Sequence, residues 1–331
     1  MDKSTLKIIF MGTPEFAVAS LQALVEGGYN VVAVVTQPDK PVGRHQDTLQ
    51  APPVKQYAIE HHIPVLQPVR MKDETFIAQL RSYQADLQAV VAFRMLPQVV
   101  WDMPRFGTFN VHAALLPQYR GAAPINWAVI NGETQTGVTT FFLDKDIDTG
   151  RIIDSKPFDI PDDADAEYVY DGLMHLGAQL CRETIDRVIE GNGQVASTQQ
   201  PECSDLKPAP KIHKETCEID WQRPAKQVYD FIRGLSPYPG AWSALGMADG
   251  ESTKATMTLK IFKTAKTTEP ATEPAGTIAI DGRRLLIACA DCWLAVEQLQ
   301  ISGKRRMAVQ DFLNGMRSID AYRCILPEKQ A

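Results

Sequence analysis

The residues best suited to carry chemistry lie within the segment 107–150. Asn110 and His112 stand two positions apart in a short apolar run, so on a β-strand both side chains point to the same face. An asparagine amide can donate a hydrogen bond to an oxyanion, and an imidazole can carry a proton near neutral pH. Asp148, in a later Asp-Thr-Gly turn, can accept a hydrogen bond from that imidazole and fix its tautomer. Together these residue types fit acyl transfer to an amine without a metal.

Each of these features alone also has a purely structural explanation. An isolated Asn-x-His pair on a strand is more often a satisfied structural pair, and an isolated Asp-Thr-Gly is usually only a turn. The occurrence of both in one order, with a Gly- and Pro-rich loop between them, favours a functional site.

The elements that must position these residues alternate along the first half of the chain. Apolar runs predict strands at 6–11, 31–36, 64–67, 86–92 and 108–112. Helix patterns lie between them, at 14–28, 52–62 and 74–83. This alternation predicts an open, doubly wound, mostly parallel α/β sheet of the Rossmann-like type. Such sheets bind ligands beyond the carboxyl ends of their strands, where we expect Asn110 and His112 to lie.

The turn after the first strand argues against a dinucleotide-binding oxidoreductase. Its sequence is Gly12-Thr13-Pro14-Glu15, which lacks the Gly-x-Gly-x-x-Gly pattern that cradles a pyrophosphate. The predicted sheet alone would suit a dehydrogenase, but the missing glycines weaken that interpretation.

The order of elements changes in the remainder of the chain. Two strands joined by a turn are predicted at 136–144 and 151–160, followed by a long helix at 166–191. A polar, Pro-punctuated stretch follows, then a helix at 224–235 and short strands at 255–266, 276–280, 283–289 and 293–301. Such strands predict a small OB-like β-barrel. We therefore predict a catalytic domain over 1–191, a linker over 192–214 and a barrel domain over 215–331.

Composition and charge restrict the class of protein. The chain has 331 residues, of which 44% are hydrophobic and 22% charged, an ordinary balance for a globular protein. Residues 207–331 hold 18 Lys and Arg against 14 Asp and Glu, whereas residues 1–206 hold 16 against 26. A polyanionic partner would therefore be bound mainly by the second part.

The lengths of the apolar runs and the pattern of cysteines indicate the cellular compartment in which the protein works. No apolar run reaches the roughly 18 residues that a membrane span needs, and the N-terminus does not resemble a signal peptide. Cys289 and Cys292 form one Cys-x-x-Cys motif without a second pair, which does not favour a zinc site. We expect a cytoplasmic monomer that binds no metal and no membrane.

The motifs around Asn110 resemble the signature of formyltransferases that use 10-formyltetrahydrofolate. They are Asn110-x-His112, Leu115-Leu116-Pro117, Arg120-Gly121-Ala122-Ala123-Pro124, Thr136-Gly137-Val138-Thr139 and Asp148-Thr149-Gly150. Segments at 10–17, 35–44, 209–221 and 302–315 resemble the branch of this family that formylates methionine esterified to initiator tRNA. The resemblance covers nearly the whole chain.

This resemblance implies roles for particular residues. Asn110 and His112 would stabilise the oxyanion that forms when the methionine amine attacks the formyl carbon, and Asp148 would orient the imidazole. The folate head would lie against two segments that end predicted strands. Their residues are Phe93, Arg94, Met95 and Leu96 in one segment, and Ala114, Leu115, Leu116 and Pro117 in the other. The family often has serine where this chain has Ala114, so a folate contact there would come from backbone or packing.

The resemblance also implies basic residues that bind the phosphates of initiator tRNA. They are Arg44, Lys207, Lys211, Lys214, Lys304, Arg305 and Arg306. The loop that follows Arg44 is usually basic in the family, but here it contains Gln46 and Asp47. This loop therefore offers fewer positive charges to the acceptor stem.

Two other functions remain open at this point. A formyltetrahydrofolate hydrolase, or a transferase acting on a nucleotide-sugar amine, would share Asn110, His112 and Asp148 because the carbonyl chemistry is the same. A non-catalytic nucleic-acid-binding protein would use the barrel alone and would bind tRNA without binding folate. Formyl transfer to charged initiator tRNA, compared with release of free formate, separates these possibilities.

Overall fold

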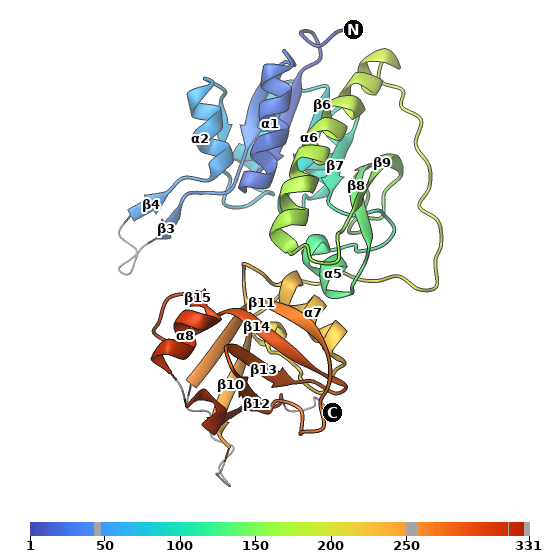
Figure 1. Ribbon diagram of the computed structural model, residues 1–331. Helices are drawn as coiled ribbons and strands as arrows, with labels where there is room; N and C mark the ends of the chain where they lie inside the picture. Colours follow the sequence, from blue (N-terminus) through green and yellow to red (C-terminus); the bar gives the residue numbers. More distant parts are fainter. Residues whose placement is uncertain (43–47, 249–256, 317, 328–331) are drawn as a thin grey trace. The chain divides into compact units, whose positions relative to one another are not determined.

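The computed structural model describes residues 1–42, 48–248, 257–316 and 318–327 (Figure 1). The chain forms two compact units. The first contains residues 1–124, 135–159 and 170–209, and the second contains residues 125–134, 160–169 and 210–331. The division is therefore not one cut in the sequence, because two early segments pack with the later part of the chain.

The first unit is built on a mixed sheet with the strand order β5-β2-β1-β6-β7-β8-β9. The strands through β7 pair in parallel, and β8 and β9 continue the sheet in antiparallel fashion. Their bounds are Ile8–Gly12 (β1), Val31–Val35 (β2), Val65–Leu66 (β5), Leu87–Val91 (β6), Thr108–His112 (β7), Gln135–Phe142 (β8) and Ile152–Asp159 (β9). The prediction of a doubly wound, mostly parallel sheet is confirmed.

Helices cover both faces of this sheet because its central strands are apolar on both sides. On one face, Ile9 and Met11 of β1 share a core cluster with Phe76 and Leu80 of α3 (Glu74–Ser82), and α4 (Gln98–Trp101) joins the same cluster. On the other face, α1 (Glu15–Glu26) and α6 (Ala166–Glu190) lie side by side (Figure 1). Gly177 of α6 lets the helix backbone approach β7 and β8 there.

Two shorter elements complete the first unit. Helix α2 (Pro53–Glu60) packs beside α1, and strands β3 (Lys40–Val42) and β4 (Thr48–Gln50) form a small antiparallel pair. Arg44 lies between these two strands and outside the described residues. No helix in the described part of the chain combines the length and apolarity that crossing a membrane requires.

The second unit contains an antiparallel sheet with the order β12-β13-β14-β11-β10-β16, and β15 pairs with β14. A bridge between Thr277 and Arg323 brings its two ends together, so the sheet is nearly closed. The strand bounds are Ala241–Met247 (β10), Met257–Pro270 (β11), Ile278–Asp281 (β12), Arg284–Ala288 (β13), Cys292–Ile301 (β14), Met307–Ala308 (β15) and Tyr322–Cys324 (β16). The prediction of a small OB-like barrel is confirmed.

Helices and two earlier segments complete the core of the second unit. The helices and 3₁₀ turns are α5 (Pro124–Ile130), η1 (Glu215–Cys217), α7 (Ala225–Gly234), α8 (Val309–Gly315) and η2 (Ile319–Ala321). Asn126 Nδ2 of α5 donates to the Gly234 carbonyl, and Arg233 donates to the Ala164 carbonyl. These bonds hold the segments 125–134 and 160–169 in the second unit.

Candidate active site

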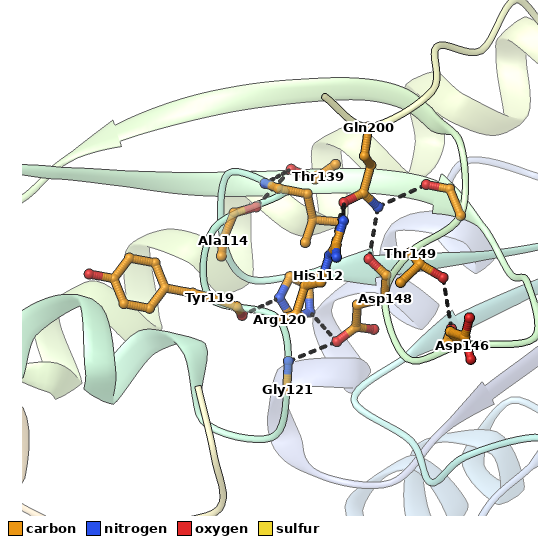
Figure 2. Close-up of polar contacts among 12 residues, drawn as sticks. His112, Ala114, Tyr119, Arg120, Gly121, Thr139, Asp146, Asp148, Thr149 and Gln200 are labelled. Atoms are coloured by element: carbon orange, nitrogen blue, oxygen red, sulfur yellow. Dashed lines mark hydrogen bonds and ion pairs between the residues drawn. The ribbon is translucent and has the colours of Figure 1, made fainter. Parts of the chain in front are cut away.

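Strand β7 places Asn110 and His112 on the same face of the sheet, at its carboxyl end (Figure 2 shows His112). The other residues of β7, Thr108, Phe109 and Val111, are buried, and its neighbours are parallel β6 and antiparallel β8. The Asn110 amide is partly exposed and makes no hydrogen bond to any described residue. His112 is buried, with 6% of its surface exposed. The Asn110 amide can therefore bond to a ligand, and the imidazole of His112, two positions later, is buried.

The loop that follows β7 turns back onto His112. Its ring Nε2 lies 2.9 Å from the Tyr119 carbonyl oxygen, an atom that can only accept a hydrogen bond. The proton on this side of the ring is therefore on Nε2. Tyr119 adopts a φ of +59°, in the left-handed region, which aims its carbonyl at the ring (Figure 2).

Asp148 approaches the other ring nitrogen from the turn between β8 and β9. Its Oδ2 accepts a hydrogen bond of 2.9 Å from the Gly121 backbone N–H and lies 3.8 Å from His112 Nδ1. Asp148 itself has a φ of +56°. The structure therefore brings together the imidazole and the carboxylate that the sequence places far apart.

The two ring nitrogens of His112 therefore face two different oxygen acceptors. With Nε2 protonated toward Tyr119, a neutral ring would point the lone pair of Nδ1 at the Asp148 carboxylate. The gap of 3.8 Å also lets one small donor group contact both Nδ1 and Oδ2.

Gly150 ends the Asp-Thr-Gly turn because no side chain fits there. A Cβ at this position would lie 1.7 Å from the Phe142 carbonyl oxygen, which belongs to backbone that cannot yield. The close approach of the two backbones returns the chain from β8 to β9 within two residues of Asp148. The third residue of the motif is thus explained by packing.

Thr139 on β8 fixes the loop that contains Ala114 and Leu116. Its hydroxyl donates to the Ala114 carbonyl at 2.7 Å and accepts from the Leu116 N–H at 3.2 Å. All these atoms are buried, so one hydroxyl satisfies two main-chain groups that water cannot reach (Figure 2). The backbone of the Leu-Leu-Pro segment is therefore held in one conformation.

Replacing Thr139 by valine is expected to lower the free energy of unfolding by about 1–3 kcal/mol, because the buried Ala114 carbonyl and Leu116 N–H then lose their hydrogen-bond partner. The matched control is Thr136→Val on the same strand. The Thr136 hydroxyl is buried and has no partner among the described residues, so a methyl group in its place should be neutral or stabilising. Denaturant unfolding measures both variants, and equal stability of the two would contradict this role for Thr139.

The segment after β6 has a mixture of buried and exposed residues. Leu96 belongs to the core and Phe93 packs against it, whereas Met95 is 70% exposed. The Arg94 guanidinium donates to the Pro68 and Val69 carbonyls, and burial lowers its pKa from the ordinary value. Ala92 begins the segment with a φ of +46°. Met95 is thus the one exposed residue among 93–96.

The segment 194–209 forms a strap over the first unit, which the sequence did not predict. Thr198 pairs with Ile152 of β9, and Ala209 exchanges backbone hydrogen bonds with the Arg120–Ala123 segment. Gln200, a residue that motif analysis missed, bonds to the backbone at Asp148 and Gly150 (Figure 2). A polar stretch without periodicity gives no signal of such contacts.

The predicted phosphate-binding residues differ in their surroundings. Lys207, Lys211 and Lys214 are exposed along the segment that leads into the second unit. Lys304 and Arg305 are exposed and make no ion pair or hydrogen bond through their side chains to any described residue. Arg306 is held by Gln298 and lies over the Phe262 ring, 4.4 Å from its centroid. Arg44 lies outside the described residues.

Nothing in the described part of the chain gathers three or more residues that could ligate a metal. Cys289 is buried and Cys292 is partly exposed, at the turn between β13 and β14. Burial raises the pKa of the Cys289 thiol to about 12, which disfavours the thiolate that a metal would need.

This fold and site define a transferase, and the chain belongs to the formyl transferase family. A model of the formyl transferase domain matches residues 6–185, and a model of the formyl transferase C-terminal domain matches residues 211–317. Within this family, the curated relatives with high sequence identity share one name. Methionyl-tRNA formyltransferase from Parabacteroides distasonis is 54% identical over 325 residues, 97% of this chain and 99% of the relative. The enzyme of the same name from Bacteroides fragilis is also 54% identical, over 327 residues.

Solved structures of low sequence identity share the fold. An N-formyltransferase from Helicobacter canadensis, solved with folinic acid and dTDP-3-aminofucose, matches with a TM-score of 0.61 at 20% identity. It covers 92% of this chain and 100% of that one. HypX from Aquifex aeolicus, solved with tetrahydrofolic acid, matches with a TM-score of 0.61 at 18% identity, over 94% of this chain and 47% of its own.

Proposed function

We propose that this protein transfers the formyl group of 10-formyltetrahydrofolate to the amino group of methionyl-initiator tRNA. The product, N-formylmethionyl-tRNA, serves translation initiation, which places the protein in the cytoplasm. The observation that carries the proposal is the approach of Asp148 to His112 at the carboxyl end of β7, the strand that carries Asn110 on the same face. It occurs in a chain that matches relatives named for this reaction over nearly its whole length.

Asn110 and His112 act on the charge that develops during transfer. When the neutral methionine amine attacks the formyl carbon, a C–N bond forms and the formyl oxygen gains negative charge. The unpartnered Asn110 amide is free to donate to that oxygen, and a donor that needs no rearrangement is worth most in such a step. The His112 side chain lies on the same face of the strand.

Asp148 and His112 provide the route for the proton. The amine must lose a proton after attack, and the folate nitrogen must gain one as its bond to the formyl carbon breaks. Oδ2 of Asp148 and Nδ1 of His112 are 3.8 Å apart, so an amine or a water can contact both. This pair can accept the first proton and deliver one to the leaving nitrogen.

The folate head is proposed to lie against the Leu115–Pro117 segment and beside Met95. A flat pteridine needs an apolar slot with backbone donors and acceptors at its edge. Leu115 is partly exposed, and Thr139 holds the backbone around it. Ala114 is fully buried and offers no surface, and Leu96 is a buried core residue.

The test is formyl transfer by the purified protein from 10-formyltetrahydrofolate to charged initiator tRNA. The proposal expects N-formylmethionine after mild hydrolysis of the tRNA. Methionyl-tRNA whose amine is already acetylated is the matched control, because it has no nucleophile and should accept nothing. Release of free formate without transfer would instead indicate a hydrolase. Binding of tRNA without binding of folate would indicate a nucleic-acid-binding protein.

Lys304 and Arg305 are proposed to contact tRNA phosphates, since they are exposed cations whose side chains bind no described residue. Replacing both with alanine should raise KM for tRNA and leave kcat unchanged. Each lost phosphate contact should also flatten the plot of log KM against log salt concentration by about 0.7–0.9.

Arg284→Ala is the control for this measurement. Its guanidinium is already neutralised by Glu269 and Asp281, so its removal should leave the salt slope unchanged. A salt slope in the Lys304/Arg305 double variant equal to that of the unmodified protein would assign these residues to another role.

A further inference from the structure

Gln200 lies between the loop that carries Arg120 and the turn that carries Asp148 (Figure 2). Its Nε2 donates to the backbone carbonyl oxygens of Asp148 at 2.7 Å and Gly150 at 2.8 Å. Its Oε1 accepts from Nε and Nη2 of Arg120 at 3.1 and 2.5 Å. One amide thus uses both of its hydrogens and both lone pairs of its oxygen.

Only one orientation of this amide satisfies its neighbours. Carbonyl oxygens cannot donate and a guanidinium cannot accept, so the nitrogen must face Asp148 and Gly150 and the oxygen must face Arg120. Gln200 is 6% exposed, which leaves little access for water to replace it. A buried polar network whose members are all satisfied specifies a single arrangement of the segments it joins.

The turn at Asp148 needs such support. Its φ of +56° is costly for a residue with a side chain, by on the order of 1 kcal/mol. Among the described residues, the carboxylate is held by one bond, from the Gly121 N–H. Its distance of 3.8 Å from His112 Nδ1 therefore depends on where the backbone of the turn is fixed.

We propose that Gln200 is a positioning residue for formyl transfer: its amide anchors the backbone of residues 148–150 and so keeps the Asp148 carboxylate beside His112. The inference rests on the proposed function and adds to it a residue outside the family motifs. Gln200 touches neither substrate; it acts through Asp148.

The test is Gln200→Glu. Glutamate keeps an acceptor for Arg120 but has no hydrogens to donate, and it sets a carboxylate oxygen against two carbonyl oxygens. The expected result is a fall in kcat of about 10- to 100-fold, the size that follows small misplacements of reacting groups. KM for tRNA and for folate should change by less than about twofold. The control is Gln199→Ala, which removes an exposed neighbouring amide with no partner among the described residues and should leave kcat unchanged.

A double-mutant cycle separates positioning from general damage. In an Asp148→Asn background, measured as single turnovers with excess enzyme, Gln200→Glu should cost less than about twofold, because its target is already disabled. The same loss in both backgrounds would overturn the inference, as would unchanged kcat in the single variant.

A second variant covers the case in which a buried glutamate prevents folding. Gln200→Met has similar shape and adds no charge, and thermal unfolding confirms that it is folded before its kcat is compared; the same fall is expected. The unmodified protein is assayed in parallel. If it does not formylate tRNA, the proposed function fails together with the inference. If it does and Gln200→Met matches it, only the inference fails.

Discussion

Asn110→Ala is expected to lower kcat for formyl transfer by about 10²- to 10³-fold, the usual cost of losing one oxyanion donor. KM for both substrates should change little, because the bond is strongest to the charged oxygen of the transition state. The variant should remain fully folded. The Asn110 amide has no partner among the described residues, so its removal leaves no buried group unsatisfied.

Steady-state kinetics and thermal unfolding measured together test this prediction. Asn30→Ala is the control, because it removes an asparagine amide of the same unit whose hydrogen bond, to the Ser4 carbonyl, lies at the surface. A kcat for Asn110→Ala within tenfold of that of the unmodified protein would refute the assignment of Asn110 as the donor to the formyl oxygen.

His112→Ala is expected to lower kcat by at least about 10²- to 10³-fold. The substitution removes half of the pair proposed to move the proton, and proton transfer by a placed group is typically worth 10²–10⁴. The Tyr119 carbonyl also loses its bond from Nε2, so the free energy of unfolding should fall by about 1–3 kcal/mol. Activity is therefore measured well below the melting temperature.

Two comparisons make the His112 result specific. His175→Ala removes an exposed imidazole that bonds only to a carbonyl on its own helix, and it should leave kcat unchanged. Combining His112→Ala with Asp148→Asn should cost no more than His112→Ala alone, because the carboxylate then has nothing to orient. Additive losses would mean that the two side chains act separately.

The sequence predicted the sheet well because its strands are strongly apolar and evenly interrupted. β1, β2 and β6 are buried along most of their length, and continuous apolar runs are typical of parallel strands covered on both faces. That Asp148 would lie beside His112 was also predicted. The two strands that follow β7 fold back against it, so the turn between them can reach the end of β7 where His112 lies. The roles of these residues and of Asn110 stay predictions until the variants are assayed.

Other features could not be predicted because they depend on tertiary contacts. Helix α5 lies in a stretch interpreted as a Gly- and Pro-rich loop, and its bond to Gly234 joins it to a segment far away in the chain. Gln200 stands in a polar stretch that reads as a linker, and its four hydrogen bonds become visible only when Arg120 and the Asp148 turn meet. Local composition contains no signal for either.

The strap over the first unit limits how the protein can be divided. A fragment cut at residue 191, where the long helix has ended, would lose Gln200 and every backbone bond that Ala209 makes to the Arg120–Ala123 segment. Chimeras that exchange the two halves between relatives must therefore place their junction after Ala209. Insertions that lengthen the connection between the two units belong beyond the same point, since a change upstream would disturb the backbone bonds of Thr198 and Ala209.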